Sequence, residues 1–350
     1  MRRKIELIAF TETGLKLGRL LADKLEEAGR AAGLTECFGK GHISLKVWTE
    51  NAFREAEGLV FIGAAGIAVR AIAPFVCSKA GDPAVVVLDE KAGYCVSLLS
   101  GHLGGANDLA RLAAACTGAV PVITTATDVN GLWAADTWAV HHNCRVLNPE
   151  RIKSVSSRIL SGETVFMRSQ FPVAGKLPGG VELTQEEDCD ILLSVGKSAA
   201  GNPLRLVPVI AAAGVGCRRG VSADEIERAW ELLFHSGDLC PEAVKKVCSI
   251  DLKREEPGLV EFCMRKGLPF ETFPSWELAA VPGTYTASSF VKEITGVENV
   301  CERSAVLGSG GNLLIRKTVC GGVTVAAALE LYVPCFEVWP PDEIGCMTAR

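Results

Sequence analysis

Residues 58–75, GLVFIGAAGIAVRAIAPF, decide the fold class of this chain of 350 residues. The apolar run 58–63 predicts a buried strand, and the glycine-rich segment after it predicts a tight turn that leads into a short helix. A Val/Ile/Phe run without polar alternation is typical of a strand buried on both faces of a parallel sheet. This stretch therefore predicts one strand–turn–helix step of an α/β fold.

The alternation of strands and helices continues over residues 1–140. An amphipathic helix is predicted at 15–29, and a hairpin-like turn is predicted at 90–93. A glycine-rich loop and another amphipathic helix follow within 100–118. The predicted strands of this region are 5–10, 58–63, 83–89, 94–99 and 120–124.

The rest of the chain divides at a change in composition. Residues 141–205 are more polar and predict a small, less regular middle module. The strand–helix pattern then resumes, beginning with one buried strand predicted within 205–216. We therefore predict an α/β protein in which two mainly parallel α/β domains, 1–140 and 206–350, are joined by the middle module.

The composition indicates which kinds of partner this protein does not bind. The formal net charge of −5 gives no basic field that would attract nucleic acid. The longest apolar run, 58–69, is shorter than the ~20 residues that a membrane span needs. The 14 cysteines include no CxxC pair, which excludes common zinc and iron–sulfur spacings and favours reduced thiols. We expect a cytoplasmic protein that binds no nucleic acid, no membrane and no metal ion of its own.

Three glycine-rich turns follow predicted strands, at 63–70, 100–108 and 214–220. Ligands of open α/β sheets bind beyond the carboxyl ends of strands, where helix N-termini offer free N–H groups. None of the three turns has the complete G-x-G-x-x-G pattern, and the chain has no Walker motif, so a nucleotide-dependent oxidoreductase is only weakly indicated. Glycines that simply make tight turns are the alternative interpretation.

His102 lies between glycines in the second of these turns. A neutral imidazole accepts a proton near pH 7, so His102 is a candidate general base, although a loop histidine is more often structural. Polar residues within 124–131 follow the next predicted strand, and any one of them alone suits a turn or a cap. Together, these residues suggest one ligand site after the strands of one sheet: His102, Asn107, Thr125, Asp128 and Asn130.

Three arginines are candidates for binding an anion. Arg70 lies in the first glycine-rich turn, and Arg218 and Arg219 precede a predicted helix whose Ser222 and Glu225 form a capping box. A cation near a helix N-terminus opposes the helix dipole by a few tenths to ~1 kcal/mol, and an anionic ligand would compensate. The alternative is that these side chains point to solvent, where the cost is small.

Seven segments, in order along the chain, carry a resemblance to a known family. They are FIGAAGIAVRAIAP (61–74), DPAVVVLDE (82–90), LLSGHLGGANDLA (98–110), PVITTATDVNGLWAAD (121–136), GVGCRRGVSADEIERA (214–229), SSFVKEITGVENVCERSAVL (288–307) and GGVTVAAA (321–328). Together they resemble the cobalt-precorrin-5A hydrolase (CbiG) family over most of the chain, except 141–205. The C-terminal domain is also similar to CobE, a small protein of the aerobic cobalamin pathway.

The resemblance implies an enzyme of anaerobic cobalamin (vitamin B12) synthesis, a hydrolase acting on a carbon–carbon bond. Such an enzyme hydrolyses the ring A δ-lactone of cobalt-precorrin-5A, releases acetaldehyde and leaves cobalt-precorrin-5B. Cobalt arrives inside the substrate, so no cofactor is expected. The expected partners are the cobalt-corrinoid substrate and, transiently, other enzymes of the pathway. The alternative is a non-catalytic corrinoid carrier, which the similarity to CobE suggests.

Roles for the candidate residues follow from this implied reaction. Water must attack the lactone carbonyl, so a base is needed, with His102 as the first candidate and Asp128 as the second. Backbone N–H groups at 63–66 or 104–106 are the expected oxyanion donors, and arginines suit the carboxylates of the substrate. The predicted substrate-binding residues are Gly63, Gly66, Arg70, Gly104, Gly105, Asn107, Thr125, Asn130, Arg218 and Arg219.

Overall fold

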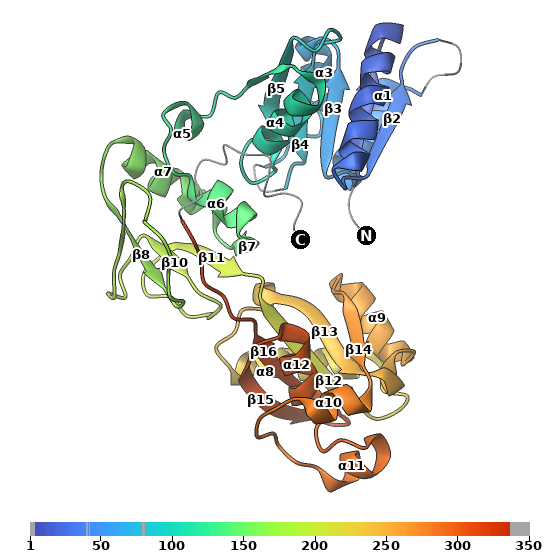
Figure 1. Cartoon of the computed structure of the whole chain (residues 1–350), viewed down its shortest axis with the longest axis vertical. Helices are drawn as coiled ribbons and strands as arrows, with labels where there is room; N and C mark the ends of the chain where they lie inside the picture. Colours follow the sequence, from blue (N-terminus) through green and yellow to red (C-terminus); the bar gives the residue numbers. More distant parts are fainter. Residues whose placement is uncertain (1–3, 40, 42, 79–80, 337–350) are drawn as a thin grey trace. The chain divides into compact units, whose positions relative to one another are not determined.

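The computed structural model describes residues 4–39, 41, 43–78 and 81–336 (Figure 1). The described residues form two compact units. One comprises 4–141 and 152–163, and the other comprises 142–151 and 164–336. Each unit interleaves strands with helices in mainly parallel sheets, which confirms the predicted α/β class. The predicted boundaries at 140 and 205 stay a prediction.

The first unit is built on a six-stranded sheet in the order β2-β1-β3-β4-β5-β6. Neighbouring strands from β2 to β4 are parallel, β5 is antiparallel to β4, and β6 is parallel to β5. Every residue of β3 and β4 is buried, as their continuous apolar sequences predict. The strands are β1 (Ile5–Ala9), β2 (Ala32–Glu36), β3 (Gly58–Ile62), β4 (Ala84–Leu88), β5 (Tyr94–Leu99) and β6 (Val120–Val122).

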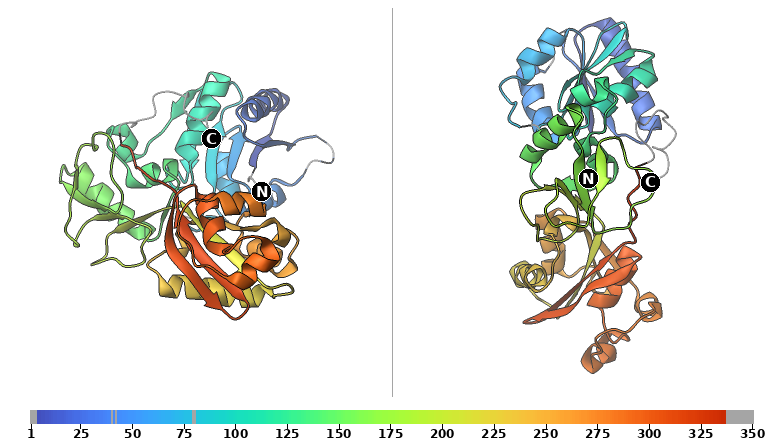
Figure 2. Two further views of the ribbon diagram at one scale, coloured as in Figure 1. Left: turned by 60° about the horizontal axis from the view of Figure 1, so that its bottom comes forward. Right: turned by 90° about the vertical axis from the view of Figure 1, so that its left-hand side faces the viewer.

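Helices cover both faces of this sheet. The helices α1 (Glu12–Glu27) and α4 (Ala106–Thr117) pack on one face. The helices α2 (Leu45–Glu55) and α3 (Ala65–Ile72) pack on the other face. The right-hand view of Figure 2 shows the sheet between these two helical layers. The same unit contains α5 (Ala126–Val129), α6 (Ala135–His141) and α7 (Ile152–Leu160).

The direction of β5, which runs antiparallel to β4, determines which loops lie at the same edge of the sheet. Ile62 at the end of β3 pairs with Leu88 at the end of β4, whereas Leu99 at the end of β5 pairs with Val85 near the start of β4. The loops after β3 and β5 therefore lie at opposite edges of the sheet, about 17 Å apart for strands of this length. Because β6 is parallel to β5, the segment after β6 lies at the same edge as the loop after β5.

The second unit contains a five-stranded sheet in the order β7-β11-β10-β8-β9. The single strand predicted within 205–216 is wrong, because β11 and β12 (Ala211–Cys217) pair in different sheets. Proline has no N–H to donate to a ladder, which suits the end of β11 at Pro208. The strands of this sheet are β7 (Cys144–Val146), β8 (Val165–Ser169), β9 (Val181–Leu183), β10 (Ile191–Leu193) and β11 (Leu204–Pro208).

The other sheet of this unit has the order β14-β13-β12-β16-β15. The helices α8 (Ala223–Ser236) and α9 (Pro257–Lys266) pack on one face, and α12 (Cys301–Ser309) packs on the other. A Cβ on Gly214 would lie 1.8 Å from the carbonyl oxygen of Cys301, so glycine there allows α12 to approach β12. The remaining elements are β13 (Val244–Ile250), β14 (Phe270–Phe273), β15 (Asn312–Cys320), β16 (Val323–Leu329), α10 (Ser275–Ala280) and α11 (Ser289–Thr295).

Candidate active site

The loop between β5 and α4 carries His102. The loop closes on itself, because the N–H groups of Gly105 and Ala106 donate to the carbonyls of His102 and Ser100 at 2.9 and 3.0 Å. Gly105 has a φ of +82°, which favours glycine. A Cβ on Gly104 would lie 2.3 Å from the Cβ of Ser100, so this position has no room for a side chain. The glycines around His102 thus build a tight turn.

His102 lies between two carboxylates. Its Nε2 is 2.9 Å from Oδ2 of Asp128, and its Nδ1 is 3.1 Å from Oδ2 of Asp136. All three side chains are largely buried, with exposed fractions of 14%, 10% and 8% respectively. An ionised carboxylate only accepts hydrogen bonds, so two such partners require a proton on each ring nitrogen. The geometry is that of an imidazolium held between two anions.

Asp128 is the centre of a wider network. Its Oδ2 accepts hydrogen bonds from Asn107 Nδ2 at 3.0 Å and from Thr125 Oγ1 at 2.8 Å, in addition to the contact with His102. Its Oδ1 accepts from the Arg111 guanidinium at 2.7 Å. Asn107 is oriented for this role, because its Oδ1 accepts from Ser97 Oγ at 2.7 Å. Side chains from β5, the loop after it, α4 and the residue before α5 therefore fix this carboxylate.

The pKa values of His102 and Asp128 follow from these contacts. Burial alone would lower the pKa of His102, but the hydrogen bonds and negative charges of Asp128 and Asp136 outweigh it and raise the pKa from 6.5 to about 9. Burial alone would raise the pKa of Asp128, but hydrogen bonds from His102, Arg111 and Thr125 hold it well below its usual range. At neutral pH the pair is an imidazolium and a carboxylate, so His102 accepts a proton only after it has lost one.

Two charged members of this network, Asp136 and Arg111, were not among the residues predicted to form a site. Asp136 is the last residue of the segment 121–136 that carries the family resemblance, and Arg111 lies one turn after Asn107 on α4. The helical spacing i, i+4 could have indicated that Arg111 and Asn107 share a face. Arg111 also contacts Asp108, which in turn accepts a hydrogen bond from His141 at 2.7 Å.

Other predicted residues of the first unit lie elsewhere. Gly63 and Gly66 follow β3, so they lie at the sheet edge opposite His102. The Arg70 guanidinium donates to the carbonyl of Gly66 at 3.1 Å. The side chain of Asn130 donates to the carbonyl of Ala126 at 2.8 Å and so binds the end of α5. The two predicted groups of oxyanion donors, 63–66 and 104–106, therefore do not share an edge.

Arg218 and Arg219 belong to the second unit, in the turn between β12 and α8. The predicted capping box is present, since Ser222 and Glu225 exchange side-chain and backbone hydrogen bonds. The Arg218 side chain is 68% exposed, and its Nη2 lies 3.2 Å from Oε1 of Glu225, which partly neutralises its charge. Arg219 is exposed at the surface. Both guanidinium groups are thus accessible to a ligand.

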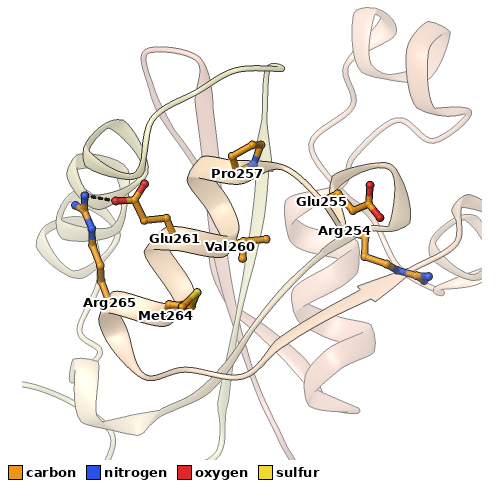
Figure 3. A pocket seen from close by; sticks show the side chains of 7 residues that line it. All are labelled: Arg254, Glu255, Pro257, Val260, Glu261, Met264 and Arg265. Atoms are coloured by element: carbon orange, nitrogen blue, oxygen red, sulfur yellow. Dashed lines mark hydrogen bonds and ion pairs between the residues drawn. The ribbon is translucent and has the colours of Figure 1, made fainter.

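A separate open pocket lies on the second unit and contains none of the predicted site residues. Figure 3 shows its lining, in which Arg254 and Glu255 precede α9 and the other side chains come from α9 itself. Two of the lining side chains, Glu261 and Arg265, form an ion pair. The lining residues are Arg254, Glu255, Pro257, Val260, Glu261, Met264 and Arg265.

The described residues contain neither a metal-binding cluster nor a membrane-spanning helix. Within 4–39, 41, 43–78 and 81–336, no group of three or more His, Cys, Asp or Glu side chains is arranged to hold a metal ion. None of the helices that the structure describes is both long enough and apolar enough to cross a bilayer. The cysteines in these parts of the chain are free thiols. The absence of a resident cofactor stays a prediction.

Comparison with known proteins agrees with the resemblance seen in the sequence. The family model for the N-terminal region of cobalamin synthesis protein G matches residues 47–128, and the model for its C-terminus matches 211–328. A cobalt-precorrin-5A hydrolase of Salmonella typhimurium is 37% identical over 92% of this chain and 96% of its own length. One from Priestia megaterium is 32% identical over 83% of each chain.

The similarity to CobE is also found. Protein CobE of Sinorhizobium sp. is 27% identical over 33% of this chain and 77% of its own length. The predicted family is therefore confirmed by two family models and by relatives that align with most of the chain. The chain belongs to the cobalamin synthesis G (CbiG) family.

Proposed function

We propose that the protein is a cobalt-precorrin-5A hydrolase of cobalamin synthesis. The observation that carries the proposal is its 37% identity to a cobalt-precorrin-5A hydrolase over 92% of the chain. The geometry supports the proposal, because ester hydrolysis needs a group that transfers protons. His102 is fixed between two carboxylates, and all three residues lie in the segments 98–110 and 121–136 that carry the family resemblance. The substrate is then the cobalt corrinoid, and cobalt enters the site as part of that substrate.

The proposed reaction acts on the ring A δ-lactone. Water adds to the lactone carbonyl, and the acyl–oxygen bond breaks to leave a carboxylate and an alkoxide. The alkoxide collapses to acetaldehyde as its carbon–carbon bond to the ring breaks, and the electron pair of that bond passes to the macrocycle, which then takes a proton. This makes the protein a hydrolase acting on a carbon–carbon bond, with cobalt-precorrin-5B as the product.

The residues of the first unit supply proton transfer and positioning in this proposal. His102, once neutral, is the first candidate for the base that activates water, and Asp128 is the second. Asp128 is the weaker base of the two, because four donors already occupy its oxygens. Among the predicted oxyanion donors at this edge, Gly105 and Ala106 donate within the loop, so the N–H of Gly104 is the proposed donor.

Arginines are proposed to bind the carboxylates of the substrate. Guanidinium groups form bidentate, charge-assisted hydrogen bonds with carboxylates. Arg218 and Arg219 are accessible in the second unit, and Arg70 is accessible on α3. Asn107 and Thr125 instead act through Asp128, since both of their side chains are bound to it. Gly63, Gly66 and Asn130 remain predicted contacts of the substrate.

The direct test is release of acetaldehyde from cobalt-precorrin-5A by the purified protein. We expect one acetaldehyde per substrate, measured as NADH consumed in the presence of added alcohol dehydrogenase. His102→Gln should lower turnover at least a hundredfold with little change in affinity, within the usual range for loss of general acid–base catalysis. His235→Gln is the matched control, because His235 lies exposed on α8 and contacts its own helix. Tight binding without acetaldehyde would favour a corrinoid carrier instead.

A further inference from the structure

The two carboxylates beside His102 differ in what else they bind. Asp128 keeps three other donors if His102 leaves, namely Asn107, Thr125 and the positively charged Arg111. Asp136 is also buried, and its other oxygen accepts from the backbone N–H of Thr137 at 3.1 Å. Among the described residues, the positively charged group in contact with Asp136 is the His102 imidazolium. The two sides of the imidazole are therefore not equivalent.

This difference predicts which hydrogen bond opens more easily. Separation of His102 from Asp136 would leave a buried carboxylate without its cation, which is costly. Separation of His102 from Asp128 would leave a carboxylate that still has Arg111 and two neutral donors. The Nε2 side is thus the side that a substrate can enter at lower cost. Thr127 Oγ1 lies 3.4 Å from Nε2 on this same side.

We infer that Asp136 is the positioning residue of this site, holding His102 by Nδ1 so that Nε2 is the nitrogen that exchanges protons with substrate. Asp128 then holds Nε2 only while the site is empty. The charged groups around His102 are Asp136 from α6, Asp128 from α5 and, through Asp128, Arg111 from α4. The inference rests on the proposed function for its substrate, but the position of the protons can be tested without it.

The first experiment needs no substrate. The chain has five histidines, so the ¹⁵N resonances of His102 can be assigned by comparison with His102→Gln. When the pH is raised through about 9, the wild-type ring should lose the proton on Nε2 and keep the proton on Nδ1. A neutral ring that keeps its proton on Nε2 would overturn the inference. This result stands whether or not the protein releases acetaldehyde.

The second experiment uses Asp136→Asn, which keeps an acceptor for Nδ1 but removes the charge. We expect a lower pKa for His102 and at least a tenfold loss of kcat with KM nearly unchanged. Asp82→Asn is the matched control, because Asp82 is 7% exposed and accepts from the N–H groups of Cys77 and Ser78. The control should leave the titration of His102 unchanged. An unchanged titration in Asp136→Asn, or a kcat within twofold of wild type, would refute the assignment.

Discussion

Asn107 and Thr125 are hydrogen-bonded to each other at 2.9 Å, and both donate to the same oxygen of Asp128. They come from different segments, the first turn of α4 and the residue before α5. They meet because β6 is parallel to β5, so the two strands deliver their following segments to one edge. The site is therefore a product of strand direction as much as of residue type.

The pH dependence of turnover should report the protonation of His102. If neutral His102 is the base, kcat/KM should rise about tenfold per pH unit and level off near pH 9. If the imidazolium instead acts as an acid, kcat/KM should fall above pH 9. A profile that is flat between pH 6 and 10 would mean that His102 does not ionise in the rate-limiting step. His235→Gln should reproduce the wild-type profile.

Stability should also depend on this ionisation. The pKa of His102 in the folded protein, about 9, lies above the ordinary value of 6.5, so the folded state binds the proton more tightly. The resulting stabilisation, on the order of 3 kcal/mol, is complete below about pH 6.5 and is lost as the pH rises through 9. Urea denaturation of wild type and His102→Gln at pH 6 and pH 10 should show a loss of stability in the wild type that the variant lacks.

The loop that carries His102 should not tolerate a side chain at Gly104. Gly104→Ala places a methyl group 2.3 Å from the Cβ of Ser100, and overpacking of this kind costs about 1–3 kcal/mol. We expect a lower melting temperature and a large loss of turnover, because the turn before α4 must shift. Gly179→Ala is the control, since nothing lies within 4 Å of its added Cβ. Equal melting temperatures for the two variants would contradict this account.

The arginines of the second unit should contribute to affinity rather than turnover. Removal of Arg218 and Arg219 together should weaken corrinoid binding about tenfold or more, because charge-assisted hydrogen bonds contribute roughly 1.5–3 kcal/mol each. Turnover at saturation should change little. Arg228→Ala removes another exposed arginine from α8 and should bind substrate normally. Unchanged affinity in the double variant would remove Arg218 and Arg219 from the substrate site.

Much of the fold was predictable because local sequence controls it. The buried strands β3 and β4 and the capping box at Ser222 lie where apolar runs and capping residues predicted them. Strand β2 was missed because its sequence, AGLTE, has one large apolar residue, Leu34, and lies only partly buried at the edge of the sheet. Residues 205–216 were predicted as one strand because their apolar run is continuous. The structure divides this run into β11 and β12, because each pairs with strands of a different sheet, and local sequence does not indicate that pairing.

The candidate site was only partly predictable. His102, Asn107, Thr125 and Asp128 were grouped from the sequence because each follows a strand, and the structure places them in contact. Arg111 was missed, because its i, i+4 spacing from Asn107 indicates a shared helix face but does not identify Asp128 as its partner. The positive charge of His102 was also not predictable, because it depends on two carboxylates that only the tertiary structure places on opposite sides of the ring.

The antiparallel direction of β5 relative to β4 has a practical consequence for chemical labelling of the protein. It assigns the loop after β3 and the turn at 90–93 to one edge of the sheet and the proton-transfer residues to the other. Changes in the turn at 90–93, where no substrate contact is proposed, should therefore leave the chemistry intact. Lys91 is exposed in that turn, so a cysteine introduced there offers an attachment point for a fluorescent reporter that does not disturb His102.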